Sequence, residues 1–101
     1  MNQLAKSQLF SQVFNNAQRL RYKNYVEFQY SHNMPSFLGF IIGKKYGNAV
    51  NRNYLKRISR ENFNNIFKEI NVSVILKPIN NDLTYSDVKK SFLNLKEQVE
   101  I

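Results

Sequence analysis

The sequence predicts an α+β fold, a single-domain α-β sandwich in which helices cover a mixed sheet of about four strands. Three observations support this prediction. The chain has 101 residues, which suits one small domain. Hydrophobic residues make up 43% of it, enough to form a core. Segments with helical and with strand periodicity follow one another in the order α-β-β-β-α-β-α. No repeat or linker divides the chain, so residues 1–101 are expected to form one domain.

The first half of the chain predicts one helix and three strands. Apolar residues recur at three- and four-residue spacing over 4–17, which is typical of an amphipathic helix. A weak strand signal at 19–23 precedes an alternating stretch at 25–30 that is rich in aromatic residues. After a turn at 33–36, residues 37–42 are apolar at nearly every position. That run predicts a central strand buried on both faces.

The second half predicts a loop, a helix, a strand and a last helix. The loop covers 43–48, where Gly47 suits a positive φ. Helical periodicity then runs from Asn48 or Asn51 to Phe67, with either asparagine as a possible cap. The inner stripe of this helix is expected at Leu55, Ile58, Asn62 or Phe63, and Ile66.

A short strand and a last helix close the chain. The strand is expected at 72–76. Thr84 with Asp87 then resembles a capping box before a helix whose inner face is Val88, Phe92, Leu95 and Val99.

Charge is the main functional signal in this sequence. Fifteen Lys and Arg against seven Asp and Glu give a net charge of +8, which predicts a polyanionic partner such as nucleic acid. The absence of cysteine excludes a zinc finger and a thiol nucleophile, and the single histidine, His32, is interpreted as a strand-end residue. The acidic residues are scattered without metal-ligand spacing, so we expect neither a catalytic centre nor a cofactor bound by the protein alone. No apolar run spans a membrane and no signal region opens the chain, so we expect a cytoplasmic protein.

A cluster of cations occupies the middle of the chain. Residues 44–60 contain six of the fifteen cations and no acid. On a helix Arg52, Lys56 and Arg60 form one stripe, with Asn53 and Arg57 beside it. Like charges four residues apart destabilise a helix by about 0.2–0.5 kcal/mol per pair, so clustering them favours a role in binding phosphates. A solvated basic face without function is the alternative.

The same segment carries a specific resemblance. Residues 43–63 read GKKYGNAVNRNYLKRISRENF. This run is similar to the signature of the bacterial ribonuclease P protein subunit, which reads roughly SKKxGNAVxRNRxKRxxRExF. The likeness extends outward to the residues around Phe10 and Phe14, to 25–28, to 38–40 and to 77–85. Tyr54 stands where the family has the second arginine of its Arg-Asn-Arg run, and Gly43 where serine is usual.

The resemblance implies a function, a topology and two binding surfaces. It implies a subunit of the ribonucleoprotein that removes the 5′ leader of precursor tRNA, in which the RNA subunit performs the hydrolysis with Mg²⁺. It also implies a left-handed β-α-β crossover, against the usual right-handed rule. The surface implied for the catalytic RNA comprises Lys44, Lys45, Arg52, Asn53, Lys56, Arg57 and Arg60. The surface implied for the single-stranded leader comprises Phe10, Phe14, Val26 and Phe28.

Alternatives remain open at this point. The spacing of the four leader residues is also that of core residues, and the resemblance leaves stacking on the rings of Phe10, Phe14 and Phe28 open beside that interpretation. A ribosomal or other structural RNA-binding protein has similar charge. A helix-turn-helix DNA-binding domain fits less well, because the basic helix is flanked by strands rather than joined to a second helix by a short turn.

Overall fold

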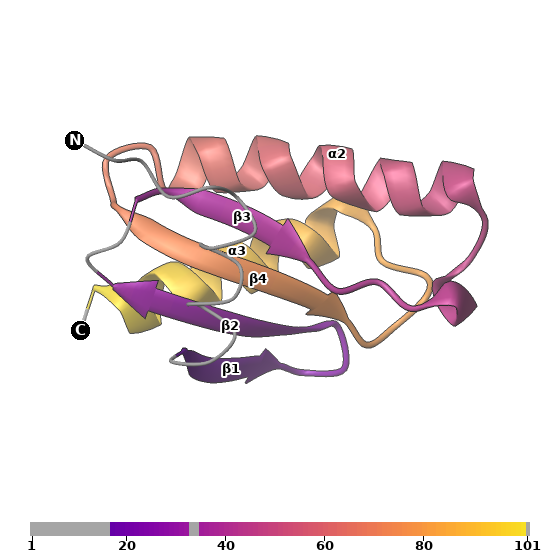
Figure 1. Ribbon diagram of the computed structural model, residues 1–101, viewed down its shortest axis with the longest axis horizontal. Helices are drawn as coiled ribbons and strands as arrows, with labels where there is room; N and C mark the ends of the chain where they lie inside the picture. The colour runs from indigo at the N-terminus through magenta and orange to yellow at the C-terminus, as the bar shows by residue number, and fades with distance from the viewer. Residues whose placement is uncertain (1–16, 33–34, 101) are drawn as a thin grey trace.

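The computed structural model describes residues 17–32 and 35–100 of the chain (Figure 1). The helix expected over 4–17 therefore lies almost entirely outside the described residues. Within them, the helices and strands follow the predicted order, and a short 3₁₀ turn lies inside the loop expected over 43–48. They are β1 (Gln18–Tyr22), β2 (Val26–His32), β3 (Phe37–Phe40), the 3₁₀ turn η1 (Lys44–Tyr46), α2 (Ala49–Ile66), β4 (Val72–Pro78) and α3 (Tyr85–Val99).

The four strands form one mixed sheet in the order β1-β2-β4-β3. β1 and β2 make an antiparallel hairpin, and β2 also pairs antiparallel with β4, so that Phe28 lies opposite Leu76. β3 pairs parallel with β4, and α2 connects these two neighbours. β3 is thus an edge strand. The prediction that 37–42 form a central strand buried on both faces is wrong, because β4 takes that position with five consecutive buried residues.

Both described helices pack on the same face of the sheet. The ring of Phe92 in α3 lies 5.1 Å from that of Phe28 in β2 and 6.2 Å from that of Phe63 in α2. Figure 1 views the sheet from the other face, with α3 behind it and β3 above β4, both strands running from left to right. In this arrangement the β3-α2-β4 crossover is left-handed, as the resemblance implied.

Alternation along β2 separates the two faces of the sheet. Val26, Phe28 and Tyr30 are buried on the helix side, where Phe28 and Tyr30 lie opposite the buried Leu76 and Val74 of β4. Gln29 is paired with Ile75 and lies on the opposite face. The core therefore lies between the sheet and the two helices, and it includes Leu55 and Ile58 of the predicted stripe on α2.

The helix caps follow the sequence closely. Asn48 is the N-cap of α2, and its Oδ1 accepts a hydrogen bond of 2.9 Å from the backbone N–H of Asn51, which itself lies inside the helix. Thr84 and Asp87 form the capping box of α3, as predicted. The hydrogen bond from the Thr84 backbone N–H lowers the pKa of Asp87 below its ordinary value. None of the helices in the described ranges is both long and apolar enough to cross a membrane.

Candidate nucleic-acid interface

The basic residues of α2 are set in place by the helix's own amphipathic pattern. Its buried side consists of Leu55, Ile58, Ser59, Asn62 and Phe63. The cations lie outside this stripe, with Arg52 and Lys56 half-buried and Arg57 and Arg60 exposed. The first turn contains no acidic residue, so its positive end is not neutralised locally. The helix therefore turns its apolar stripe to the core and most of its charge outward.

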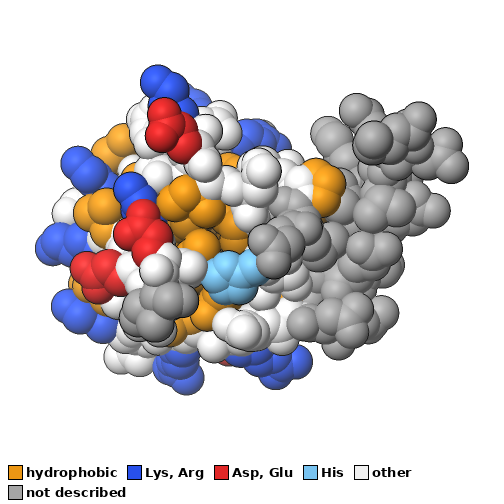
Figure 2. Space-filling view, turned by 90° about the vertical axis from the view of Figure 1, so that its left-hand side faces the viewer, with side chains coloured by type: hydrophobic (Ala, Val, Ile, Leu, Met, Phe, Trp, Pro, Cys, Tyr) orange, Lys and Arg blue, Asp and Glu red, His pale blue; other side chains and the backbone are white. Residues whose placement is uncertain are grey.

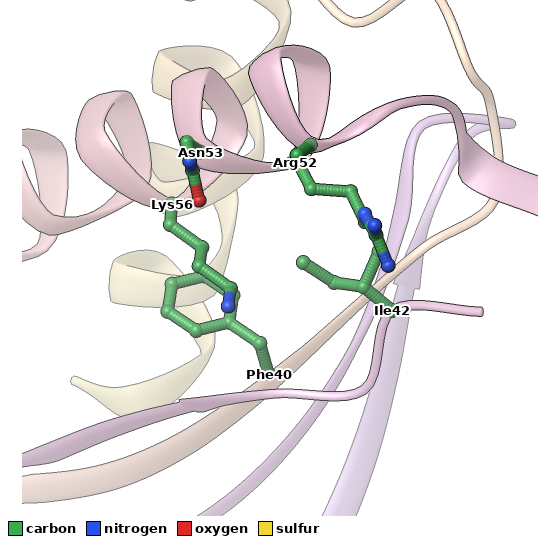
Figure 3. Close-up of a pocket in the computed structure, with 6 residues that line it drawn as sticks. Phe40, Ile42, Arg52, Asn53 and Lys56 are labelled. Carbon is green, nitrogen blue, oxygen red and sulfur yellow. The ribbon is translucent and has the colours of Figure 1, made fainter. Parts of the chain in front are cut away.

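A shallow cavity separates the start of α2 from the segment that follows β3. It has a volume of about 340 Å³ and is lined by Phe40, Ile42, Ala49, Arg52, Asn53 and Lys56. Figure 3 shows Arg52 and Lys56 extending from the helix toward Ile42 and Phe40. The cavity thus combines an apolar floor with two cationic side chains above it.

Arg60 continues this row one turn further along the helix. Its guanidinium carbon lies 5.7 Å from the centre of the Phe40 ring, which is a cation–π contact. Arg52, Lys56 and Arg60 therefore line the flank of α2 that faces β3, and we call them the basic row. In the described part of the chain, Lys96 and Glu100 form a salt bridge, and no residue of the basic row forms one. These positive charges are available to an anionic partner.

The other predicted RNA-binding residues lie on two neighbouring surfaces. Asn53 lines the cavity of the basic row and also a second depression, which it shares with Arg57. Lys44 and Lys45 are exposed on η1, just before α2. Lys45 lines a separate cavity of about 300 Å³ together with Lys77 at the end of β4. The predicted set is thus one continuous segment of chain that presents its charges in more than one direction.

Sequence reasoning missed the apolar floor formed by Phe40 and Ile42. Both were expected inside a central strand, where no partner can reach them. Because β3 is at the edge of the sheet, both remain half-buried and line the cavity under α2. No local sequence signal distinguishes an apolar edge strand beside a basic helix from an apolar central strand.

The predicted leader surface requires a correction. Val26 and Phe28 are completely buried on the helix side of β2, and the ring of Phe28 packs against Phe92. These two residues are core residues, and the prediction that they contact the leader is wrong. Phe10 and Phe14 lie outside the described residues, so their role stays a prediction. The opposite face of β2 carries Gln29, which is also buried.

No metal-binding cluster is found among residues 17–32 and 35–100. Within these ranges no three His, Cys, Asp or Glu side chains come together as a possible metal site. His32 is exposed at the end of β2, and its ring lies 5.6 Å from that of Tyr30. What the described site offers is positive charge, amide groups and aromatic surface, and these are the groups that bind RNA backbone and unpaired bases.

The fold and this interface define a class of protein: a small α+β nucleic-acid-binding domain whose basic helix crosses over between two parallel strands. Comparisons with known proteins make the class specific. The family model for ribonuclease P matches residues 1–100. The ribonuclease P protein component of Bacillus pumilus is 33% identical over 100 residues, covering 93% of this chain and 84% of that protein. The component of Finegoldia magna is 35% identical over 77 residues, covering 72% of this chain and 68% of that protein.

Solved structures agree on the fold. The RNase P protein of Thermotoga maritima superposes with a TM-score of 0.73 at 23% identity and full coverage of both chains. A mutant RNase P protein of Staphylococcus aureus, described as defective in mRNA degradation, gives a TM-score of 0.76 at 23% identity, covering 96% of this chain and 86% of that one. The chain belongs to the ribonuclease P protein family.

Proposed function

We propose that this protein is the subunit of ribonuclease P that docks on a catalytic RNA through the basic row and its neighbours, and so assists removal of the 5′ leader from precursor tRNA. The observation that carries the proposal is the flank of α2 itself. Arg52, Lys56 and Arg60 stand in line on it, outside any salt bridge in the described residues, beside the half-buried ring of Phe40. Such a row matches the spaced negative charges of an RNA backbone.

In this proposal the protein binds the catalytic RNA, and that RNA carries out the hydrolysis. Mg²⁺ would be held by the RNA and would supply the activated water and the stabilisation of the leaving oxygen. The cations of α2 would lower the repulsion between the catalytic RNA and the precursor, because each neutralised phosphate removes negative charge from their contact. The proposal keeps Phe10 and Phe14 as leader contacts and includes a cytoplasmic location.

Reconstitution with the cognate catalytic RNA tests the proposal. The wild-type protein should lower the Mg²⁺ concentration needed for half-maximal cleavage of precursor tRNA. The Arg52→Ala/Lys56→Ala double variant should lose most of this effect, because it removes two charges from one cavity wall. Lys89→Ala is the matched control, since it removes an exposed charge from α3 and should behave as wild type.

A saturating amount of folded protein that leaves the Mg²⁺ requirement unchanged would contradict the proposal. If that protein still bound the RNA tightly, the result would favour a structural RNA-binding protein without a role in processing.

A further inference from the structure

The outer flank of α2 carries an exposed strip, formed by Val50, Tyr54 and Arg57, that the basic row does not explain. Val50 is 73% exposed and Tyr54 is 41% exposed, although the helix already buries a complete apolar stripe on its other side. Val50, Asn53, Tyr54 and Arg57 together line a depression of about 400 Å³. A large aromatic side chain held in such a position is available to a partner.

The ring of Tyr54 is held by a cation. The guanidinium carbon of Arg57 lies 5.3 Å from the centre of the ring, one turn along the helix. This cation–π contact restrains the ring and places a positive charge at its edge of the depression. A partner that stacks on the ring therefore meets a positive charge in the same place. That combination favours an anionic chain with flat bases over a purely apolar partner.

The strip and the basic row are close enough to contact one RNA segment. At 100° per residue, the centres of the Arg52–Lys56–Arg60 row and of the Val50–Tyr54–Arg57 strip lie roughly 120° apart around the helix. A helix with its side chains is about 10–12 Å across, so the two surfaces are separated by no more than about 12 Å. Asn53 lies between them and lines both cavities.

We propose that Tyr54, restrained by Arg57, stacks against an unpaired nucleobase of the RNA whose backbone lies on the basic row. The inference rests on the proposed function and adds to it a contact of a different chemistry. The row binds phosphates, whereas the strip binds the face of a base. RNA is the occupant that the surroundings favour, because residues 44–60 contain no acid and the depression itself contains Arg57.

Three variants at this position test the contact. Tyr54→Ala and Tyr54→Leu should each weaken binding of the cognate catalytic RNA about 5- to 100-fold, because neither side chain offers a flat ring. Tyr54→Trp should keep wild-type affinity. The slope of log affinity against log salt should stay unchanged in all three, since no phosphate contact is lost. Arg52→Ala is the comparison, and it should make that slope shallower by about 1. Because Tyr54 is exposed, all three should unfold at the wild-type temperature.

Two outcomes would overturn the stacking contact alone. One is wild-type affinity of the folded Tyr54→Leu variant, which would show that apolar packing suffices. The other is wild-type affinity of Tyr54→Ala alongside weakened binding by Arg52→Ala. If Arg52→Ala and Lys56→Ala also bind as wild type, α2 is not the docking surface and the proposed docking mode fails with the inference.

A photo-crosslinking residue at position 54 identifies the occupant directly. In the complex with the catalytic RNA, the crosslink should map to an unpaired nucleotide. A crosslink to a paired nucleotide, or to a second copy of the protein, would overturn the proposal.

Discussion

Gly47 shows how a single residue fixes the start of the basic helix. It has a φ of 146°, and a Cβ added to it would lie 3.0 Å from Nδ2 of Asn51 and 3.3 Å from its Cβ. The residue that follows is Asn48, the N-cap that starts α2. The positive φ predicted from the sequence is confirmed, and the reason is now specific. A residue with a side chain would be strained by this backbone conformation, and its Cβ would also press against Asn51 in the first turn of the helix.

We therefore expect Gly47→Ala to lower the free energy of unfolding by about 1–3 kcal/mol, the usual cost of such backbone strain. Gly43→Ala is the matched control on the other side of η1. Gly43 has a φ of −70°, and its added Cβ would meet nothing within 4 Å. That change should be neutral or slightly stabilising. Denaturant unfolding of both variants measures the difference, and equal stability of the two would contradict this account of the turn.

At the scale of the element, α2 divides its residues between folding and binding. Leu55 is fully buried in the core, whereas Arg52 reaches over the cavity beside β3. The two residues are three positions apart, only about 60° around the helix. They differ because Arg52 lies at the margin of the apolar stripe, where it is half-buried and its charged end extends over the cavity instead of into the core. Their contributions to stability and to RNA affinity should therefore be separable.

Leu55→Ala should cost about 2–5 kcal/mol of stability, because it removes a packed side chain and leaves a cavity. Arg52→Ala should change stability by no more than about 0.5 kcal/mol while weakening RNA binding. Thermal unfolding and RNA titration of the two variants check this pair. Equal destabilisation by both changes would mean that Arg52 belongs to the core and not to the interface.

At the scale of the whole molecule, the acid-free segment 44–60 contrasts with the end of α3, where acids and cations are mixed. That segment comprises η1 and most of α2, which runs along the length of the molecule (Figure 1). Figure 2 shows one end of the molecule, where His32 lies and acidic side chains stand among the lysines and arginines. At that end Nζ of Lys96 lies 3.8 Å from Oε1 of Glu100, so part of the lysine's charge is neutralised. The segment 44–60 therefore offers a polyanion a run of cations with no carboxylate among them in sequence.

The salt dependence of RNA binding tests this distribution. If four to six cations of the acid-free segment displace counterions, the slope of log affinity against log salt should be about −3 to −5, at roughly 0.7–0.9 per phosphate. Removing the charge of Lys89 on α3 should leave that slope unchanged. A wild-type slope shallower than about −1 would show that the acid-free segment does not dock on the RNA.

The sequence by itself determined the order of the helices and longer strands in the described residues and the identity of the basic helix. Periodicity and capping are local properties, so β2, α2, β4 and the capping box of α3 could be predicted from neighbouring residues. The Lys and Arg positions outside the inner stripe of α2 could be predicted for the same reason. A local pattern also gives the face that a helix turns to the core.

Only the tertiary structure decided the order of the strands and the side of the sheet that the helices cover. An apolar strand such as β3 has the same pattern at the edge or in the centre, because its neighbours in the sheet come from distant parts of the chain. Alternation along β2 shows that Phe28 and Gln29 face opposite ways, but not which face meets the helices. The resemblance placed Phe28 on a binding surface while its spacing left a core role open, and the apolar run placed Phe40 in a central strand. Packing across the sheet buries Phe28 against Phe92 and leaves Phe40 beside the cavity.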